Sequence, residues 1–326
     1  MKSALRKLTV IGLLMAAGLF LANSSQLASP PEGGPTLLAH RGLHQTFPSD
    51  GLENDTCTAT RIHRPAHRYL ENTLASMRAA FDAGAKIVEF DIHPTTDGHF
   101  AVFHDWTVDC RTDGTGVTRE KSLAELQALD IGYGYTADGG RTFPFRGEGV
   151  GLMPTLDDVL KAFPDERFLI NVKSRDPDEG RKLAHRLGKL TERERGRLTV
   201  YGHDTPLSAL REELPDIRII SYGTLTSCLL RYLGVGWSGY VPAACRNTTV
   251  LVPVNYALLL WGWPNRFLSR MQSIGTDVYV VGPYVGRGFS TGIDMPEDLA
   301  RLPAGYSGGI WTNRIDLIAP LVSASQ

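Results

Sequence analysis

The chain has 326 residues, of which 42% are hydrophobic and 21% charged, and its formal net charge is −1. This length accommodates one large α/β barrel or two ordinary domains. The balanced charge excludes the basic field that is typical of nucleic-acid-binding proteins, so we expect no nucleic-acid partner. The composition is that of a packed globular domain of the size of an enzyme.

The first two dozen residues differ in composition from the remainder. Lys2, Arg6 and Lys7 precede the apolar run LTVIGLLMAAGLFLA, which small polar residues follow. This pattern is typical of a secretory signal peptide, and the run is shorter than the roughly 20 residues that comfortably span a bilayer. We therefore interpret residues 1–24 as the cleaved signal peptide of an exported protein, periplasmic or extracellular. An uncleaved N-terminal anchor is the alternative.

All four cysteines lie beyond this segment. In an exported chain an even number of cysteines favours disulfides. Four cysteines allow three pairings, and we expect the pairs Cys57–Cys110 and Cys228–Cys245. Four separate buried thiols are the alternative, and none of the four has the close C-x-x-C spacing of a zinc site.

Short apolar and β-branched runs recur after a flexible lead-in at residues 25–35. Segments with helical periodicity lie between most of them. Alternating strands and helices indicate a mainly parallel sheet, and eight such units in roughly 250 residues make a TIM barrel, here residues 36–320. A doubly wound open sheet is the alternative. The predicted strands are 36–40, 86–92, 99–104, 167–173, 198–203, 217–223, 249–255, 277–284 and 308–313. The predicted helical segments are 71–85, 155–164, 178–196, 205–215 and 257–275.

Residues 106–153 interrupt this alternation and are rich in Gly, Thr and Asp. The stretch is too long for a simple connection between a strand and a helix. We interpret it as an inserted lobe with one short helix at residues 122–130. Because it follows a strand end, it should lie over the active face of a barrel.

Two carboxylates stand on the second predicted strand. Glu89 and Asp91 alternate with apolar residues, so both acids point to one face of the sheet. Two carboxylates desolvated together repel each other, and a bound cation, an Arg or Lys, or a shared proton must compensate them.

Further polar residues stand at other strand ends, where catalytic groups of barrels collect. A single His at a strand end is usually structural, but several polar groups at matching positions indicate a site. These groups are His40, Arg41, His104, Asp105, Asn171, Lys173, Thr312 and Asn313.

These residues belong to motifs that run in order from Leu38 to Arg314: AHRG, ENT, EFDIHPTTDGHFAVFHD, a strand ending in Lys, and GIWTNR. The set resembles the glycerophosphodiester phosphodiesterase family. The resemblance implies a TIM barrel of the phospholipase C-like phosphodiesterase type. It also implies hydrolysis of glycerophosphodiesters to glycerol 3-phosphate and an alcohol.

The resemblance also assigns roles to residues. It implies a divalent cation, Ca²⁺ or Mg²⁺, on Glu89 and Asp91, with His40 and His104 as general acid and base. Cationic side chains would neutralise phosphate oxygens as charge builds on them, and these are Arg41 and Lys173. Positioning roles go to four residues, namely Glu71, Asn72, Asp105 and Asn313. For Glu71 and Asn72 the alternative is an ordinary first turn of a helix.

The chain departs from the family pattern at two of these positions. Asn171 stands where the family usually has a metal-binding Glu; its amide oxygen can ligate Ca²⁺ or Mg²⁺ but brings no charge. Asn313 stands where the family often has Asp. We therefore expect weaker metal binding, or a ligand from elsewhere.

Two other functions stay open. One is a phospholipase D-like hydrolase or a cyclising lyase that acts on lysophospholipids, with Trp261 and Trp263 in contact with a membrane. Packing of these two rings onto the barrel is the alternative. The other is a barrel that binds a glycerophosphodiester or lipid without catalysis, which only Asn171 supports.

Overall fold

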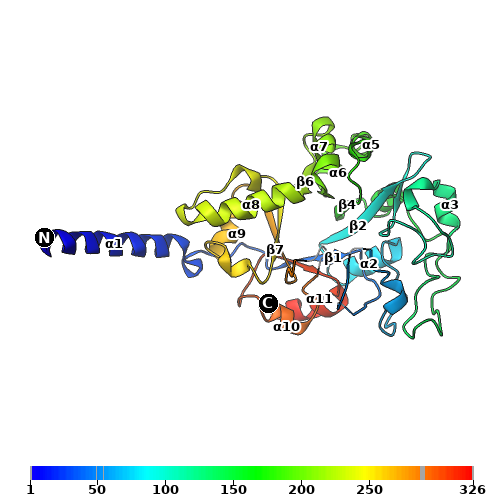
Figure 1. Cartoon of the computed structure of the whole chain (residues 1–326), viewed down its shortest axis with the longest axis horizontal. Coiled ribbons are helices and arrows are strands. Elements are labelled where there is room, and N and C mark those ends of the chain that lie inside the picture. The colour runs from blue at the N-terminus through cyan, green and yellow to red at the C-terminus, as the bar shows by residue number, and fades with distance from the viewer. Residues whose placement is uncertain (1, 49, 54, 287–290, 325–326) are drawn as a thin grey trace.

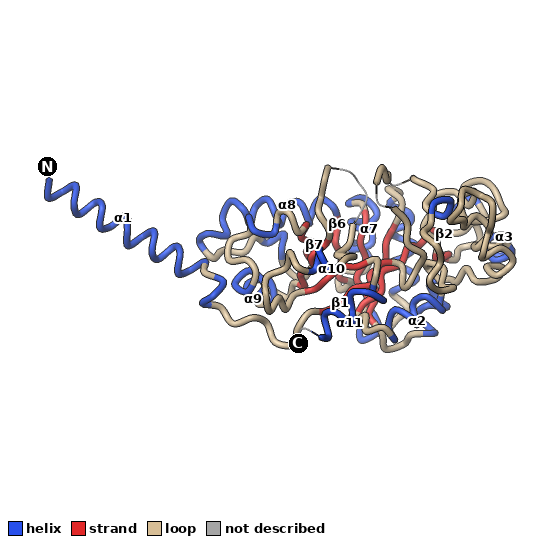
Figure 2. Tube along the Cα trace, turned by 90° about the horizontal axis from the view of Figure 1, so that it is seen from below, coloured by secondary structure: helices blue, strands red, loops and turns tan. Residues whose placement is uncertain are grey.

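The structure is a computed structural model and describes residues 2–48, 50–53, 55–286 and 291–324. Within these residues, eight parallel strands form a nearly closed barrel in the order β6-β5-β4-β2-β1-β9-β8-β7 (Figures 1 and 2). The predicted TIM barrel is therefore confirmed. Its strands are β1 (Thr36–His40), β2 (Ile87–Pro94), β4 (Arg167–Val172), β5 (Leu198–Gly202), β6 (Arg218–Ser221), β7 (Thr249–Pro253), β8 (Asp277–Val281) and β9 (Gly309–Thr312). The strand predicted at 99–104 is β3 (Phe100–Val102), which lies outside the barrel order and pairs antiparallel with the end of β2.

The register of the strands places polar residues side by side near the carboxyl ends of the barrel strands. His40 of β1 pairs with Glu89 of β2, and Asp91 of β2 pairs with Asn171 of β4, which in turn pairs with Tyr201 of β5. The apolar neighbours of the two acids on β2 pack outward into the main core between the sheet and its helices. Glu89 and Asp91 therefore share the inner face, as their alternation predicted.

Helices cover the outside of the barrel, and most of them follow the predicted segments. The helices are α2 (Leu74–Asp82), α4 (Leu156–Ala162), α5 (Pro177–Leu187), α6 (Glu192–Arg195), α7 (Asp204–Glu213), α8 (Tyr222–Val235), α9 (Asn265–Gln272), α10 (Pro296–Leu299) and α11 (Ile315–Ala324). The helix expected at residues 257–275 is wrong over its first half, because Gly262 has a φ of 84° and Pro264 follows it. A 3₁₀ turn at Ala257–Leu259 and an irregular segment precede α9 instead.

The inserted lobe has a small core of its own. Side chains of residues 101–153 pack there against Ala59, Ile62 and Leu70, so the lobe also includes a stretch after β1 that its predicted bounds of 106–153 leave out. Its short helix, α3 (Leu123–Ala128), begins with a capping box at Ser122. The disulfide Cys57–Cys110 joins the two stretches, and Cys228–Cys245 joins α8 to the segment before β7. Both predicted pairings are confirmed.

The N-terminal helix α1 (Lys2–Asn23) projects away from the barrel (Figures 1 and 2). Residues Leu5–Asn23 are long and apolar enough to cross a membrane, and none of their side chains is buried. A signal sequence and a membrane anchor both have these properties, so signal-peptide cleavage stays a prediction.

Candidate active site

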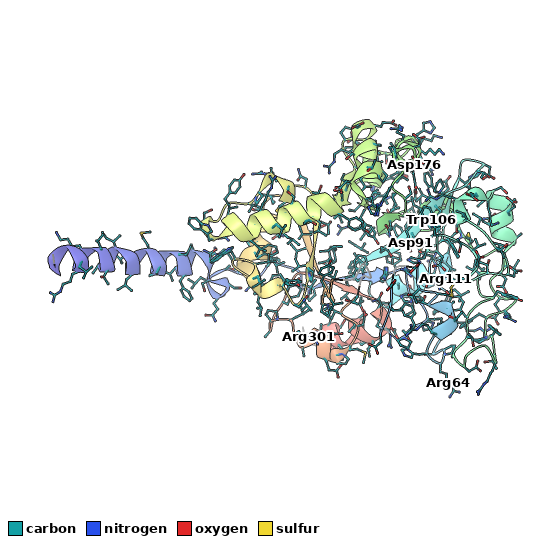
Figure 3. The ribbon with its side chains drawn as sticks, viewed as in Figure 1. Arg64, Asp91, Trp106, Arg111, Asp176 and Arg301 are labelled. Atoms are coloured by element: carbon teal, nitrogen blue, oxygen red, sulfur yellow. A yellow bond between two sulfur atoms is a disulfide. The ribbon has the colours of Figure 1, made fainter. Side chains whose placement is uncertain are left out.

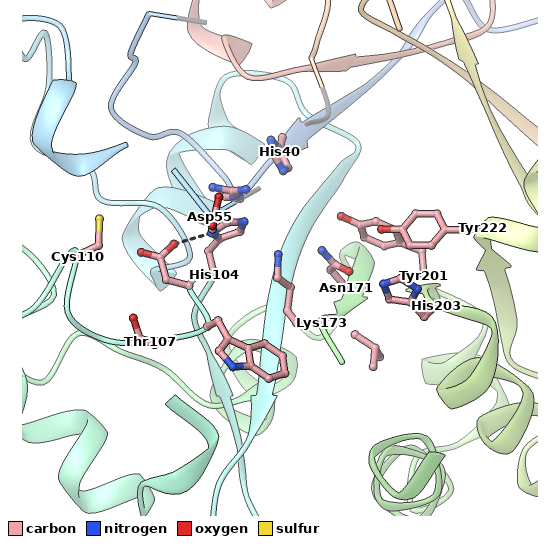
Figure 4. Close-up of a pocket in the computed structure, with 14 residues that line it drawn as sticks. His40, Asp55, His104, Thr107, Cys110, Asn171, Lys173, Tyr201, His203 and Tyr222 are labelled. Atoms are coloured by element: carbon pink, nitrogen blue, oxygen red, sulfur yellow. Dashed lines mark hydrogen bonds and ion pairs between the residues drawn. The ribbon is translucent and has the colours of Figure 1, made fainter. Parts of the chain in front are cut away.

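A cavity of about 570 Å³ opens at the carboxyl ends of the barrel strands (Figure 4). It collects six of the predicted site residues: His40, Arg41, His104, Asp105, Asn171 and Lys173. The two strand acids are fully buried and bonded to residues of its lining. Side chains from the lobe and from the barrel meet in this region, as the positions of Asp91, Trp106 and Arg111 show (Figure 3).

Asp91 is bonded on several sides. Its oxygens lie 3.4 Å from Arg41 Nε and 3.5 Å from Lys173 Nζ. The side-chain amides of Asn171 and Asn72 donate to it at 2.8 Å and 3.1 Å. Burial opposes ionisation of Asp91, but Lys173, His104 and Arg41 outweigh burial and hold its pKa well below the usual 3.8. Asp91 is therefore a carboxylate at neutral pH.

Glu89 has a different set of partners. The Tyr201 hydroxyl donates to Oε1 at 2.5 Å, the backbone N–H of Arg41 donates to Oε2 at 3.2 Å, and His40 Nε2 lies 3.6 Å from Oε2. Among the described residues, no Lys or Arg side chain forms an ion pair with Glu89. Burial, followed by repulsion from Asp91, raises the pKa of Glu89 to about 8. Glu89 is therefore mostly protonated at pH 7 when no metal is bound, and the pair of acids carries a single negative charge, on Asp91.

This raised pKa makes the stability of the metal-free protein depend on pH. Between pH 6.5 and about 8 the folded state keeps the Glu89 proton that the unfolded chain has lost, so the free energy of unfolding should fall as pH rises, by at most about 2 kcal/mol. Below this window the buried histidines contribute a slope of the opposite sign. Their folded pKa values are lowered, so the unfolded chain binds their protons first and the free energy of unfolding rises with pH. Urea unfolding with EDTA at several pH values measures the slope. The Glu89→Gln variant should lack it, and an equal slope in that variant would contradict the assignment.

His104 forms a dyad with its neighbour. His104 Nδ1 lies 2.6 Å from Asp105 Oδ1, and because a carboxylate only accepts, Nδ1 carries the proton and Nε2 has the lone pair. Arg111 Nε lies 2.9 Å from the other oxygen of Asp105, and Arg111 Nη1 lies 3.2 Å from Glu71. The buried guanidinium also donates to Tyr135 and Thr58 of the lobe. The lobe therefore fixes the orientation of His104 through Arg111.

His40 is oriented by the opposite side of the barrel. Its Nδ1 lies 2.6 Å from Asn313 Oδ1, and the Asn313 amide donates to Asp294 Oδ2 at 2.7 Å. This chain of bonds fixes the amide, so His40 Nδ1 carries the proton and Nε2 has the lone pair. Burial, and next the charge of Arg41, lower the pKa of His40 and His104 well below 6.5. Both imidazoles are therefore neutral at pH 7.

The turn after β1 places Arg41 between the acids. Arg41 has a φ of 57°, which is uncommon for a residue with a side chain. Gly42 follows with a φ of 78°, and a Cβ on it would lie 2.6 Å from Ser76 Oγ, so only Gly fits there. Arg41 Nη1 donates to Glu71 Oε1 at 3.1 Å. Glu71 and Asn72 therefore contact the predicted site residues, and α2 begins after them, at Leu74.

Three residues of this site were not singled out from the sequence: Tyr201, Arg111 and Asp294. Tyr201 is 112 residues from its partner Glu89 and Asp294 is 19 from Asn313, whereas Arg111 is only six residues after Asp105; none of the three stands in a motif that marks it. Tyr201 lies near the end of the strand predicted at 198–203, and this place near a barrel strand end is the one signal that could have indicated it. Arg111 follows Cys110, but nothing in its surroundings distinguishes it from a surface Arg.

The donor set fits a hard divalent cation. Glu89 and Asp91 on the inner face of β2, and Asn171 opposite Asp91 on β4, offer carboxylate and amide oxygens, the kind of ligands that Ca²⁺ and Mg²⁺ prefer. In the part of the chain that the structure describes, no group of three or more His, Cys, Asp or Glu is placed to hold a metal. A cation here would thus have two carboxylates, with Asn171 as a neutral third ligand. Such an ion would favour the ionised form of Glu89 and displace the proton that this carboxyl otherwise keeps.

Comparisons with known proteins agree with the motifs. The model of the glycerophosphoryl diester phosphodiesterase family matches residues 40–280. A glycerophosphodiester phosphodiesterase from Caldanaerobacter subterraneus is 31% identical over 163 residues, which cover 48% of this chain and 62% of that protein. Alignments with two Bacillus subtilis relatives cover 38% and 42% of their lengths. The chain thus spans about half the length of these three relatives.

Solved structures show the same fold. A glycerophosphoryl diester phosphodiesterase domain from Mycobacterium tuberculosis has a TM-score of 0.59 at 16% identity, with 90% of this chain and 99% of that one covered. An Oleispira antarctica phosphodiesterase, solved with the product sn-glycerol-3-phosphate, has a TM-score of 0.52 at 18% identity, with 90% and 96% covered. At these identities the likeness establishes the barrel fold.

Proposed function

Because the chain belongs to the glycerophosphoryl diester phosphodiesterase family, we propose that it hydrolyses glycerophosphodiesters to glycerol 3-phosphate and an alcohol. One observation carries this proposal: a single cavity contains two neutral imidazoles and the cations of Arg41 and Lys173 above two buried carboxylates. A phosphodiester is anionic and resists attack, so its cleavage needs neutralising charge, a base and an acid.

The partners of the two histidines suggest how they divide the work. His104 faces the full charge of Asp105, whereas His40 has at the same ring nitrogen only the hydrogen bond to the Asn313 amide, which favours its cationic form but brings no charge. An anionic substrate would raise the pKa of both rings. We therefore assign His104 as the acid that protonates the leaving oxygen and His40 as the base that takes a proton from the attacking hydroxyl through Nε2.

The cations and a metal would share the remaining task. Arg41 and Lys173 would bind the non-bridging phosphate oxygens and neutralise the charge that develops on them. A divalent cation bound to Glu89, Asp91 and Asn171 would supply a Lewis acid for a phosphate oxygen. Tyr201 and Asn72 would hold the two carboxylates in position, through the hydrogen bonds that they donate to them.

Product analysis by ³¹P NMR tests the proposal. The purified protein is incubated with glycerophosphocholine in the presence of Ca²⁺, Mg²⁺ or EDTA. We expect glycerol 3-phosphate with one of the metals and none with EDTA. Asn171→Glu should need less metal for the same rate, by roughly tenfold, because it adds a third carboxylate, whereas the exposed Asn255→Glu should not. No turnover with any metal would overturn the proposal.

Lysophospholipids are the second candidate substrate. Two aromatic side chains that line the cavity, Trp106 and Tyr222, are about half exposed, and such rings suit an apolar or choline-bearing substrate. Arg119 holds the Trp106 ring, with its guanidinium 4.2 Å from the ring centre. In the same assay, cyclic phosphate from lysophosphatidylcholine alone would identify a cyclising lyase. Substrate binding without any product would identify a non-catalytic barrel.

We also propose that the protein works outside the cytoplasm. The support is the apolar helix α1 and the two disulfides, which are rare in reducing compartments. Mass spectrometry of the protein recovered from its producing cells tests this proposal and the predicted cleavage. A mass that lacks residues 1–24 indicates cleavage, the full mass indicates an anchor, and reduced cysteines would contradict export.

A further inference from the structure

We propose that the side of the barrel from which α1 emerges docks on an anionic lipid bilayer. Five exposed apolar residues of α8, of the segment after it and of the turn after β7 define this docking surface. They are Leu230, Trp237, Tyr240, Leu258 and Leu259, with exposed fractions of 63%, 49%, 58%, 84% and 60%. Aliphatic and aromatic side chains of this kind enter the boundary between lipid headgroups and acyl chains.

The charge of the same part of the chain suits anionic lipid. The chain has 35 Asp and Glu residues, yet none lies in residues 217–276, which contain five Arg and no Lys. Arg218 is paired with Asp277, and Arg231 is exposed next to Leu230. Basic residues beside an apolar surface add attraction to a negative leaflet. The local net charge is thus positive in a chain whose total is −1.

Helix α1 is bonded to this surface. Asn23 Nδ2 donates to the carbonyl oxygen of Trp237 at 2.8 Å. Arg270 donates to Asn23 Oδ1 at 3.1 Å, to the carbonyl of Ala22 at 3.2 Å and to the carbonyl of Gly236 at 2.9 Å. The apolar length of α1 therefore starts at the docking surface. A bilayer that holds α1 would have its headgroup level at Trp237.

The arrangement of the elements agrees with this placement. Both views show α8 and α9 beside the base of α1, with the lobe of α3 at the opposite end of the molecule (Figures 1 and 2). The basic residues at the start of α1 favour an N-terminus on the cytoplasmic side. The barrel would then lie against the outer leaflet.

The two tryptophans that were candidates for lipid contact do not form the docking surface. Trp261 Nε1 donates to the carbonyl of Leu233 at 2.8 Å, and the Trp263 ring lies 5.5 Å from the Tyr306 ring, so both pack onto the protein. Their packing fixes the segment that carries Leu258 and Leu259. Tyr222, at the start of α8, lines the cavity, and the length of this helix, about 20 Å, separates it from the docking residues near Trp237.

Spin labelling of the full chain tests the proposal without reference to activity. All four cysteines are in disulfides, so a nitroxide attaches only to a new cysteine, at Leu258→Cys or at the control Val150→Cys. Val150 is 55% exposed on the lobe. In vesicles of equal parts phosphatidylcholine and phosphatidylglycerol, the label at 258 should gain oxygen collisions and lose collisions with a water-soluble nickel chelate, and the label at 150 should not change. Unchanged collision rates of the label at 258 would overturn the proposal. The proposal would also be overturned if, in detergent without vesicles, the label at 258 lost collisions with the nickel chelate as the protein concentration rose, because this result indicates a second protein molecule on the surface.

A second measurement separates the docking surface from the anchoring effect of α1. A protease site replaces residues 29–34, and the reconstituted protein is cut after folding. The barrel should stay with the vesicles, and Leu258→Ser with Leu259→Ser should weaken its binding about tenfold or more. Arg231→Gln should weaken it about fivefold, and the exposed control Arg64→Gln should not. If the cut barrel with both Ser substitutions stayed on the vesicles, its hydrogen bonds to α1 alone would hold it there, and the proposal would be overturned.

Discussion

Replacement of His104 by alanine is expected to lower the turnover of glycerophosphocholine by a factor of about 10² to 10⁴. His104 lines the cavity, its Nδ1 is held by Asp105, and its Nε2 lone pair is the one proton site of the dyad that is left for a substrate. The assay is the initial rate by ³¹P NMR at saturating metal. The substitution leaves Asp105 paired with Arg111, so the barrel should unfold at nearly the same urea concentration as before.

Two further variants make this result specific. His185→Ala removes an exposed imidazole from α5 and should leave the rate unchanged. Asp105→Asn keeps His104 but removes the charge that favours its protonated form. The loss of turnover rate in this variant should therefore grow with rising pH. A His104→Ala rate within a few fold of the original would contradict the assigned role and would leave the fold assignment intact.

Replacement of Arg111 by methionine is expected to lower the free energy of unfolding by about 3–5 kcal/mol. The guanidinium is 3% exposed and lies between the carboxylates of Asp105 and Glu71. Burial opposes the charge on Arg111, but Asp105 and Glu71 outweigh it and raise its pKa. Methionine fills much of the volume but removes the buried cation of Asp105 and one of the two cations of Glu71, which keeps Arg41, and that loss dominates the cost.

Urea unfolding at pH 7 measures this change. Arg64→Met, at an exposed position, is the control and should change the free energy of unfolding by less than about 0.5 kcal/mol. Turnover should fall as well, because Asp105 loses the group that fixes it beneath His104. An Arg111→Met protein as stable as the original would show that the lobe holds its position by apolar packing and the Cys57–Cys110 disulfide alone.

The barrel was predictable because its strands are short, apolar and regularly separated. Their carboxyl ends must meet at one face, so polar residues at strand ends indicated the site before any distance was known. Helix α8 was not predicted, since Gly and Thr in its first turn and Gly near its end weaken the helical signal. The helix expected at 257–275 is wrong over its first half because apolar content alone cannot distinguish a helix from a segment that a turn interrupts.

The site was predictable in its parts and not in their connections. His40, Glu89, Asp91 and His104 were identified from motifs, and the cavity brings both histidines together above the acids. The groups that orient them were missed. Asp294 acts on His40 through Asn313, and Arg111 acts on His104 through Asp105. Such bonds join segments that only the fold brings close together in space, so the local sequence does not reveal them.

The pairing of β1 with β9 has a consequence for the order in which the protein is completed during synthesis. His40 is translated early, yet the amide that selects its tautomer, Asn313, lies 273 residues later in the chain. A ribosome that stops before Asn313 therefore releases a chain that contains both histidines, both acids and both cations but in which the ring of His40 is unoriented. Contacts of such long sequence separation also form slowly. The orientation of His40 thus arises only after β9 has been synthesised and inserts beside β1.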